Sequence, residues 1–189
     1  LAHEFAELSL RMASGRISKV DYESALEALR AHELYSEGIE EQIEKYSTYV
    51  MEAFEHAKTV VPDPVLFIEE KLDFSHIVEE GFGTGDSGII ADGTMEVIDL
   101  KYGKGVKVEA CENPQLKLYA LGALRNYEML YDIHTVRLTI VQPRIDNIVS
   151  WDISVKDLYK WAFEVVKPIA EKAYVGKGIQ KAGEHCKFC

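Results

Sequence analysis

The sequence predicts an α/β fold in which helices lie on both sides of a mixed β-sheet, giving three layers. Helical spacing of apolar residues dominates the first 58 positions, and short apolar runs bounded by glycine, proline and aspartate follow. Two more helical stretches lie among and after those runs. The expected order is helix, helix, strand, strand, strand, helix, strand, strand, helix, in a single domain over residues 1–189.

The N-terminal part, residues 1–58, is expected to be helical because leucine, isoleucine, tyrosine and valine recur there at three- and four-residue steps. Ser18, followed three residues later by Asp21, is typical of a capping box that begins a helix. Ser36 is expected to begin the next helix. Pro62 then ends the helical part, because proline cannot continue a helix.

The central part, residues 65–153, is expected to form the sheet and its main helix. Its strands are predicted at 65–74, 87–91, 95–100, 136–141 and 148–153, and its helix at 114–130. The last part, residues 154–189, should begin with a helix capped by Ser154 and Asp157 and running to about residue 174. A lysine-rich tail follows and ends in a C-x-x-C motif.

Charge and composition exclude several classes of protein. The chain has 21 basic and 32 acidic residues, a net charge of −11, so a nucleic-acid partner would need a local basic patch or a bound cation. No apolar run approaches the ~20 residues that cross a bilayer, so no membrane partner is expected. Only three cysteines are present, which favours a reducing, cytoplasmic setting.

The segment 83–88, Gly-Thr-Gly-Asp-Ser-Gly, has the spelling of a dinucleotide-binding loop. That loop should lead from a strand into a helix that binds the pyrophosphate, whereas here the chain runs on through 89–91 into a turn. We therefore expect these glycines to allow a tight turn and a close approach of the backbone to a ligand. A nucleotide-binding protein remains an alternative on this motif alone.

A predicted hairpin brings two acidic residues together. Asp92-Gly93 is a strong two-residue turn signal, and counting outward from it along both strands places Asp86 opposite Asp99. Two carboxylates so close repel strongly unless a divalent cation or a shared proton compensates. Lys101 should lie on the same face, which completes the equipment for metal-assisted phosphodiester hydrolysis. The alternative is a turn aspartate at 86 and a surface ion pair between Asp99 and Lys101.

Three ordered motifs carry a resemblance to a known family. They are the acid at Asp86 in its glycine-rich segment, the D-x-K tripeptide 99–101, and the Q-x-x-x-Y pattern of Gln115 and Tyr119. The chain resembles RecB-like exonucleases of the PD-(D/E)XK nuclease superfamily, of the phage-encoded and CRISPR-associated type. The resemblance implies a restriction-endonuclease-like αβββαβ core, preceded here by an added N-terminal helical segment.

The same resemblance implies roles for individual residues. His3, which shares a helix face with Glu7, would bind the metal together with Asp86, Asp99 and the Leu100 carbonyl. The ion would be Mg²⁺ or Mn²⁺.

The other catalytic residues would assist the reaction. Lys101 would assist the attacking water, Gln115 would bind a phosphate or Lys101, and Tyr119 would position the substrate strand. In the alternative interpretation Tyr119 is a core residue and Gln115 a surface amide.

Two further groups of residues are weaker candidates. Lys104, Lys107 and Lys117 surround the motifs and are expected to contact DNA phosphates, unless they simply form a solvated face. Cys186 and Cys189 resemble part of the [4Fe-4S] site of some RecB-like nucleases. Because four thiolates are required, such a cluster is expected only if further cysteines follow in the parent protein. The third cysteine, Cys111, is expected to be buried.

Together these observations predict a metal-dependent DNA nuclease, an exonuclease of phage or bacterial recombination or repair. DNA is the expected partner, with recombination or phage replication proteins as possible additional ones. The alternative is a catalytically inactive nucleic-acid-binding module of a recombination complex.

Overall fold

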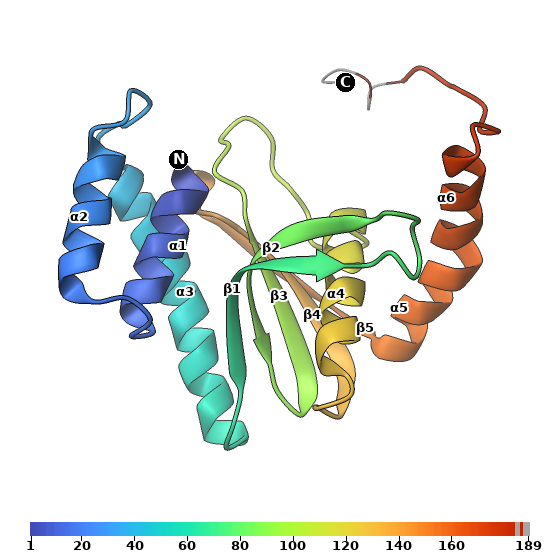
Figure 1. Cartoon of the computed structure of the whole chain (residues 1–189), viewed down its shortest axis with the longest axis horizontal. Helices are drawn as coiled ribbons and strands as arrows, with labels where there is room; N and C mark the ends of the chain where they lie inside the picture. Colours follow the sequence, from blue (N-terminus) through green and yellow to red (C-terminus); the bar gives the residue numbers. More distant parts are fainter. Residues whose placement is uncertain (184–185, 187–189) are drawn as a thin grey trace.

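A computed structural model describes residues 1–183 and 186 of the chain. Its centre is a five-stranded mixed sheet in the order β1-β2-β3-β4-β5, with helices packed on both faces (Figure 1). The predicted α/β class with a mixed central sheet is confirmed. The elements are α1 (Ala2–Ala13), α2 (Lys19–Arg30), α3 (Ile39–Val60), β1 (Val65–Asp73), β2 (Phe82–Ile90), β3 (Gly93–Leu100), α4 (Pro114–Tyr127), β4 (Ile133–Gln142), η1 (Pro143–Ile145), β5 (Asn147–Ser154), α5 (Val155–Trp161), η2 (Ala162–Val166) and α6 (Lys167–Tyr174).

The N-terminal part contains three helices where the expected order has two, and one of them begins at a different residue from the one expected. Ser18 caps α2 by accepting a hydrogen bond from the Asp21 backbone N–H, as predicted. The prediction for Ser36 is wrong, because α3 begins after Gly38, whose φ of 88° lies in the left-handed region that glycine adopts readily. The chain therefore turns two residues later than the hydroxyl signal indicated.

The sheet confirms the predicted hairpin and its register. Strands β2 and β3 are antiparallel, and Ser87 pairs with Ile98 while Ile90 pairs with Met95. This is the register that follows from a two-residue turn at Asp92-Gly93. Strand β3 then pairs in parallel with β4 through the crossover helix α4, and β5 returns antiparallel beside β4.

The glycine-rich segment lies inside β2, which begins five residues earlier than expected. None of its glycines has a positive φ, so the expected tight turn is wrong. They instead admit neighbouring side chains: a Cβ at Gly83 would lie 2.5 Å from Tyr119 Cε1, and one at Gly88 would lie 2.3 Å from Phe67 Cε1. Because β2 leads into a hairpin and not into a helix, the structure does not support the dinucleotide-loop interpretation.

Two apolar cores lie on opposite faces of the sheet. Helices α1 and α3 cover one face, where Leu10, Tyr46 and Leu100 are fully buried. Helices α4 and α5 cover the other face with residues such as Leu121 and Leu158. Among the described residues, no helix is long and apolar enough to cross a membrane.

The C-terminal helical stretch begins where the sequence indicated, since Ser154 accepts a hydrogen bond from the Asp157 backbone N–H at the start of α5. It continues through one π-helical turn, Ala162–Val166, into α6, which ends at Tyr174 as expected. In Figure 1 this stretch lies at the outer side of α4, away from the N-terminal helices.

Candidate active site

The end of β3 carries the first half of the site, where α1 crosses the sheet. His3 Nε2 lies 3.1 Å from the Leu100 carbonyl oxygen and 3.7 Å from Asp86 Oδ2. The same Asp86 oxygen accepts a hydrogen bond of 2.7 Å from the Leu100 backbone N–H. The His3 imidazole of α1 and the Asp86 carboxylate of β2 thus meet at the main chain of Leu100, at the end of β3.

The second half of the site links β3 to α4. Lys101 Nζ lies 2.9 Å from Asp99 Oδ2 and donates a hydrogen bond of 3.0 Å to Gln115 Oε1. The Gln115 amide in turn lies 3.3 Å from Asp99 Oδ1 and 3.1 Å from the Tyr119 hydroxyl. The three predicted motifs therefore meet at one end of the sheet, and Gln115 contacts Lys101 as the resemblance implied.

Helix α4 positions its two residues through a sequence-encoded start. Asn113 caps the helix by accepting hydrogen bonds from the backbone N–H groups of Gln115 and Leu116, and Pro114 occupies the first turn. Since Gln115 and Tyr119 are four residues apart, both point to the same side of the helix. The cap thus sets the direction in which these two side chains leave α4.

Burial and like charge act together on the two aspartates. Asp99 is only 2% exposed, and burial raises its pKa while the Lys101 ammonium opposes that rise. Burial, and then the negative charge of Asp99, raises the pKa of Asp86 to about 7. The site therefore holds two carboxyl groups close enough to influence each other, with one ammonium beside them. A solvated turn aspartate and a surface ion pair do not describe this arrangement.

The donor atoms fit a hard divalent cation. His3 Nε2 and the Leu100 oxygen form a hydrogen bond of 3.1 Å. Ligands at right angles around an ion with bonds of 2.0–2.1 Å are about 3 Å apart, so an ion could replace this hydrogen bond with little movement of the two atoms. Asp99 Oδ2 is buried and lies 2.9 Å from the Lys101 ammonium, so this carboxylate is already paired with one cation.

The potential metal ligands that lie together are only the His3 and Asp86 side chains and the Leu100 carbonyl, because Asp99 is paired with Lys101. In residues 1–183 and 186, accordingly, no three His, Cys, Asp or Glu side chains form a preformed metal cluster. Binding of an ion by both aspartates would require the Asp99 carboxylate to share itself between Lys101 and the ion.

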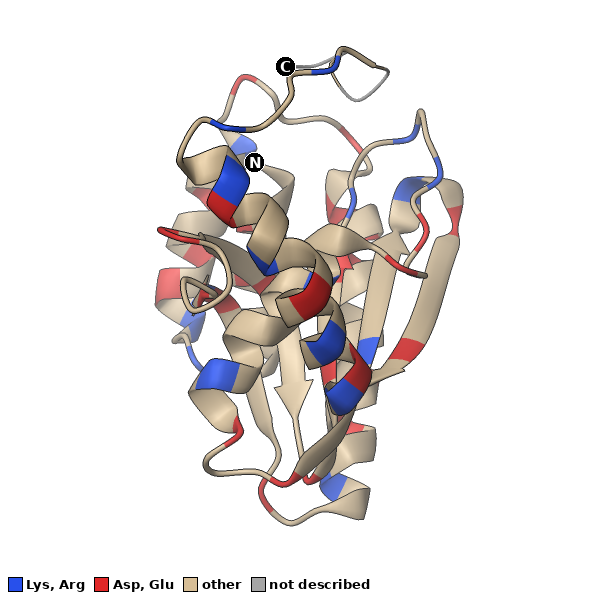
Figure 2. Ribbon diagram, turned by 90° about the vertical axis from the view of Figure 1, so that its right-hand side faces the viewer, with Lys and Arg blue, Asp and Glu red and all other residues tan. Residues whose placement is uncertain are grey.

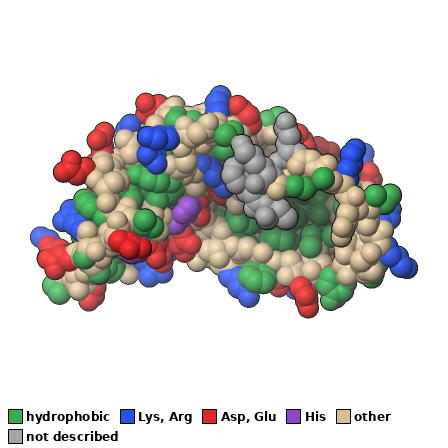
Figure 3. All heavy atoms as spheres, turned by 90° about the horizontal axis from the view of Figure 1, so that it is seen from above, with side chains coloured by type: hydrophobic (Ala, Val, Ile, Leu, Met, Phe, Trp, Pro, Cys, Tyr) green, Lys and Arg blue, Asp and Glu red, His purple; other side chains and the backbone are tan. Residues whose placement is uncertain are grey.

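The candidate site is partly open to solvent. Figure 3 views the molecule from the side where β3 ends, and it shows a histidine with acidic side chains near the middle of this face. His3 is half exposed, whereas Asp86 and Asp99 lie deeper. A substrate would thus meet the imidazole and the lysine before the carboxylates.

Sequence reasoning missed Glu69 of β1. It lies between the Ile68–Ser87 and Glu70–Gly85 pairs of the β1–β2 register, and its φ of 48° is a left-handed conformation that is costly for a residue other than glycine. Burial and the charge of Glu7 raise the pKa of Glu69, while His3 lowers it. Glu7 itself pairs with Arg11 at 2.6 Å. Glutamate, unlike glycine, does not indicate a positive φ, so the sequence around position 69 gave no signal of this conformation.

Two buried amides hold the loop that follows Lys101, and these too were missed. The side chain of Gln142 accepts a hydrogen bond from the Val108 backbone N–H and donates one to the Val106 carbonyl. Asn147 bonds to the Val108 carbonyl and to Gln142. Lys104 and Lys107 lie exposed on this loop, and Lys107 pairs with Glu109 at 3.2 Å.

The expectation that Lys117 contacts DNA is wrong. Its residue exposure is 1%, and its ammonium lies 3.9 Å from the centre of the Trp161 ring and 2.6 Å from Glu112 Oε2. Lys117 lies on the face of α4 that packs toward α5. The alternative, that this lysine belongs to a solvated face, is therefore wrong as well. The tryptophan ring and the Glu112 carboxylate stabilise the buried charge instead of phosphates.

The two cysteines that the structure describes give no support to a cluster. Cys111 is exposed, so the expectation that it is buried is wrong. Cys186 is also exposed and free, and Cys189 lies outside the described residues.

Comparison with known proteins assigns the chain to a family. A family model described as "Protein of unknown function (DUF2800)" matches residues 1–189, and the chain belongs to this family. No solved structure matches the chain.

Proposed function

For this member of the family, we propose the activity of a metal-dependent DNA nuclease that hydrolyses phosphodiester bonds. One observation carries the proposal: the buried carboxyl groups of Asp86 and Asp99 lie with Lys101 at the end of β3, beside His3 and the Leu100 carbonyl. Paired acids with one ammonium are suited to a divalent cation and a phosphate. The carbonyl is an oxygen ligand of the kind that both ions prefer, and the imidazole suits Mn²⁺ better than Mg²⁺.

The residues that would hold Mg²⁺ or Mn²⁺ are His3, Asp86, Asp99 and Leu100 through its carbonyl. A bound ion of this type would supply charge for the phosphoryl oxygens and a water of lowered pKa. Lys101 is positioned by Asp99 and Gln115, so its ammonium is held where it can orient the water and offset charge that develops on the phosphate. Such reactions gain mainly from positioning and charge stabilisation.

The resemblance to RecB-like exonucleases supports the same activity. The observed order α3, β1, β2, β3, α4, β4 corresponds to the αβββαβ core that the resemblance implies, and the acid, D-x-K and Q-x-x-x-Y motifs occupy β2, β3 and α4. We propose on this basis an exonuclease of phage or bacterial recombination or repair, acting in the cytoplasm on DNA, with recombination or phage replication proteins as further partners.

A cleavage assay tests the activity. The purified chain is incubated with end-labelled linear DNA and with closed circular DNA, in Mn²⁺, in Mg²⁺ and with chelator. We expect metal-dependent loss of the linear label and little action on the circle. Cleavage of the circle would indicate an endonuclease. Metal-dependent DNA binding with no cleavage of either substrate would instead support the inactive DNA-binding module.

The variant Lys101→Ala tests the assignment of the site. We expect cleavage to fall by at least about a thousandfold while the variant still unfolds in one cooperative thermal transition, because the lysine acts on charge that develops during the reaction. Lys19→Ala is the matched control, since Lys19 is an exposed lysine at the start of α2, paired only loosely with Glu23 at 3.8 Å. Normal metal-dependent cleavage by Lys101→Ala would defeat the assignment.

A further inference from the structure

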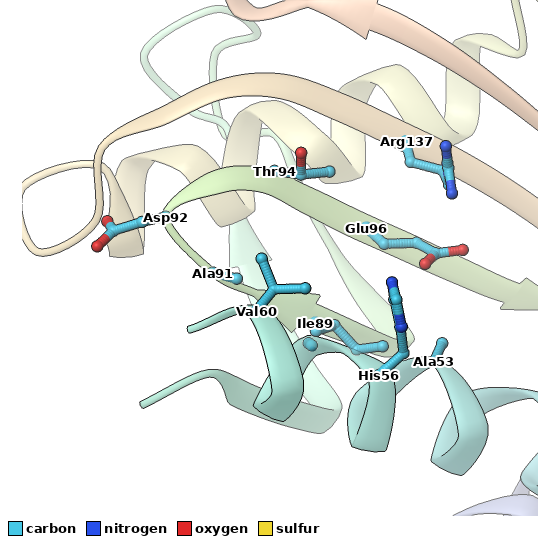
Figure 4. A pocket seen from close by; sticks show the side chains of 10 residues that line it. Ala53, His56, Val60, Ile89, Ala91, Asp92, Thr94, Glu96 and Arg137 are labelled. Carbon is cyan, nitrogen blue, oxygen red and sulfur yellow. The ribbon is translucent and has the colours of Figure 1, made fainter. Parts of the chain in front are cut away.

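A separate cavity lies at the other end of β3, between the sheet and the C-terminal half of α3. It has a volume of about 270 Å³, and its apolar wall includes Ala53, Ala57 and Ile89. Figure 4 shows Glu96 reaching into this space from β3 and His56 reaching toward it from α3. Because β3 separates Glu96 from Leu100 along its length, this cavity is independent of the candidate active site.

One carboxylate oxygen of Glu96 accepts hydrogen bonds from the protein, and the other accepts none from the described residues. Its Oε1 accepts hydrogen bonds from the Thr139 hydroxyl at 2.6 Å and from the Tyr49 hydroxyl at 3.0 Å. Its Oε2 accepts none from residues 1–183 or 186. The two hydroxyls hold the carboxylate in one orientation, so the second oxygen is presented in a defined direction.

Arg137 and His56 line the same cavity, but within the described chain neither forms an ion pair with Glu96. No lysine, arginine or histidine nitrogen of residues 1–183 and 186 lies within 4.0 Å of its carboxylate. The neighbouring Arg137 is engaged with Asp152 on β5 through two bonds of 2.8 and 3.0 Å. Burial accordingly raises the pKa of Glu96, although the positive charge of Arg137 acts in the opposite direction.

We propose that this cavity binds a primary alkylammonium group, with the ammonium on Glu96 and the alkyl chain against Ala53, Ala57 and Ile89. Charge complementarity selects a cation, and the apolar wall selects one with a hydrocarbon body. His56 and Asp92 also line the cavity, but in the part of the chain that the structure describes no three His, Cys, Asp or Glu side chains are grouped so that they could hold a metal ion. The cavity is also smaller than the roughly 300–1,000 Å³ of pockets for drug-sized ligands, so a nucleotide does not fit.

Titration with n-butylamine tests this directly, followed by two-dimensional NMR of the full chain. We expect saturable shifts of the Ala53, Ala57 and Ile89 signals with a Kd of roughly 1–10 mM, as for a ligand with very few heavy atoms. The uncharged isostere n-butanol should bind at least about tenfold more weakly, since it lacks the charge that Glu96 recognises. Equal shifts with the alcohol, or none with the amine, would overturn the proposal.

Two variants test separately whether binding needs the charge of Glu96 and whether it needs the volume of the cavity. Glu96→Gln keeps an acceptor for Tyr49 and Thr139 but removes the charge, and should weaken butylamine at least about tenfold. Ala57→Phe fills the cavity without changing charge and should abolish binding. Glu52→Gln, on an exposed part of α3, is the matched control and should bind as the parent does. Parent-like binding by both Glu96→Gln and Ala57→Phe would contradict the assigned site.

A further arm of the experiment identifies the source of the group. Free diamines and a capped lysine amide are compared with butylamine under the same conditions. Tighter binding of the lysine amide indicates a lysine side chain of a protein partner, whereas tighter binding of a diamine indicates a small free amine. Failure of all of them would overturn the proposal and would leave the nuclease proposal untouched, because the latter is tested by cleavage.

Discussion

Asp86 is the residue at which burial and charge conflict most clearly. Its carboxylate is held by the Leu100 backbone N–H and lies near the His3 imidazole, yet it faces the charge of Asp99 and lies largely away from water. Burial, the larger effect, favours the protonated form. Without a cation the folded protein therefore retains a proton that the unfolded chain would release.

This conflict predicts a pH dependence of stability. Because the pKa of Asp86 rises from 3.8 to about 7 on folding, the folded state binds more protons between these values, so stability falls as the pH rises from about 4 to about 7. The loss is at most about 4 kcal/mol, since one pKa unit corresponds to about 1.4 kcal/mol. Urea unfolding in chelator across this range measures it.

Asp86→Asn should remove this part of the pH dependence, and the exposed Asp132→Asn should not. Addition of Mn²⁺ should restore stability at neutral pH in the parent but not in Asp86→Asn. A parent and an Asp86→Asn variant with the same pH slope would show that Asp86 titrates near its ordinary value.

Lysine is usually exposed, but Lys117 is buried with its ammonium over the Trp161 ring. Lys117→Ala should lower the free energy of unfolding by about 2–4 kcal/mol, because it empties the space beside Trp161. Lys117→Met keeps the packing and removes a buried charge, and should cost less than about 1.5 kcal/mol. Urea unfolding checks both values. Weaker DNA binding by Lys117→Met than by Lys107→Ala would reinstate Lys117 as a phosphate contact.

At the scale of elements, α4 connects the sheet to the candidate site. Its N-terminal turn presents Gln115 and Tyr119 to β3 and β2, and its middle packs directly against β1 through Gly122. A Cβ on Gly122 would lie 2.8 Å from Leu72 Cβ and 3.0 Å from the Leu72 carbonyl carbon. The glycine thus sets how closely the helix approaches the strand.

Gly122→Ala should therefore destabilise the protein although alanine is the better helix former. Intrinsic propensity favours the change by about 1 kcal/mol, whereas forcing the helix from the strand costs typically 1–3 kcal/mol. We expect a net loss of about 1 kcal/mol in urea unfolding, together with weaker cleavage as Gln115 moves. Gly105→Ala is the control, since nothing lies within 4 Å of its Cβ position. A stabilised Gly122→Ala would show that the interface yields freely.

At the scale of the whole molecule, the protein carries an excess of negative charge, which would repel the proposed DNA substrate. The net charge is −11, and acidic and basic side chains alternate over the face drawn in Figure 2. The exposed lysines of the loop after β3 add only local attraction. The proposed substrate would thus depend on a bound cation as well as on lysines.

DNA affinity should therefore depend on a divalent ion even without cleavage. In Ca²⁺ we expect a labelled oligonucleotide to bind at least about tenfold more tightly than in chelator, as measured by fluorescence anisotropy at constant ionic strength. The double variant Asp86→Asn, Asp99→Asn should lose the effect of Ca²⁺. Equal affinity in calcium and in chelator would mean that the acids do not hold the ion that recruits DNA.

The sequence by itself determined the α/β class, most helix and strand positions, the hairpin register and the meeting of Asp86, Asp99 and Lys101. These follow from apolar periodicity, turn chemistry and the alternation of side chains along a strand, which are local rules. The register in particular needed only a two-residue turn between two apolar runs.

Only the tertiary structure decided which distant residues join that centre and which do not. His3 reaches Leu100 across 97 positions because α1 packs on the sheet through the Leu10 core, and Lys117 leaves the surface because α5 covers it. Gly88 leaves room for the Phe67 ring, which a Cβ at this position would meet at 2.3 Å. Such contacts depend on how faces of separate elements pack together, and packing is a property of pairs of elements that no local pattern encodes.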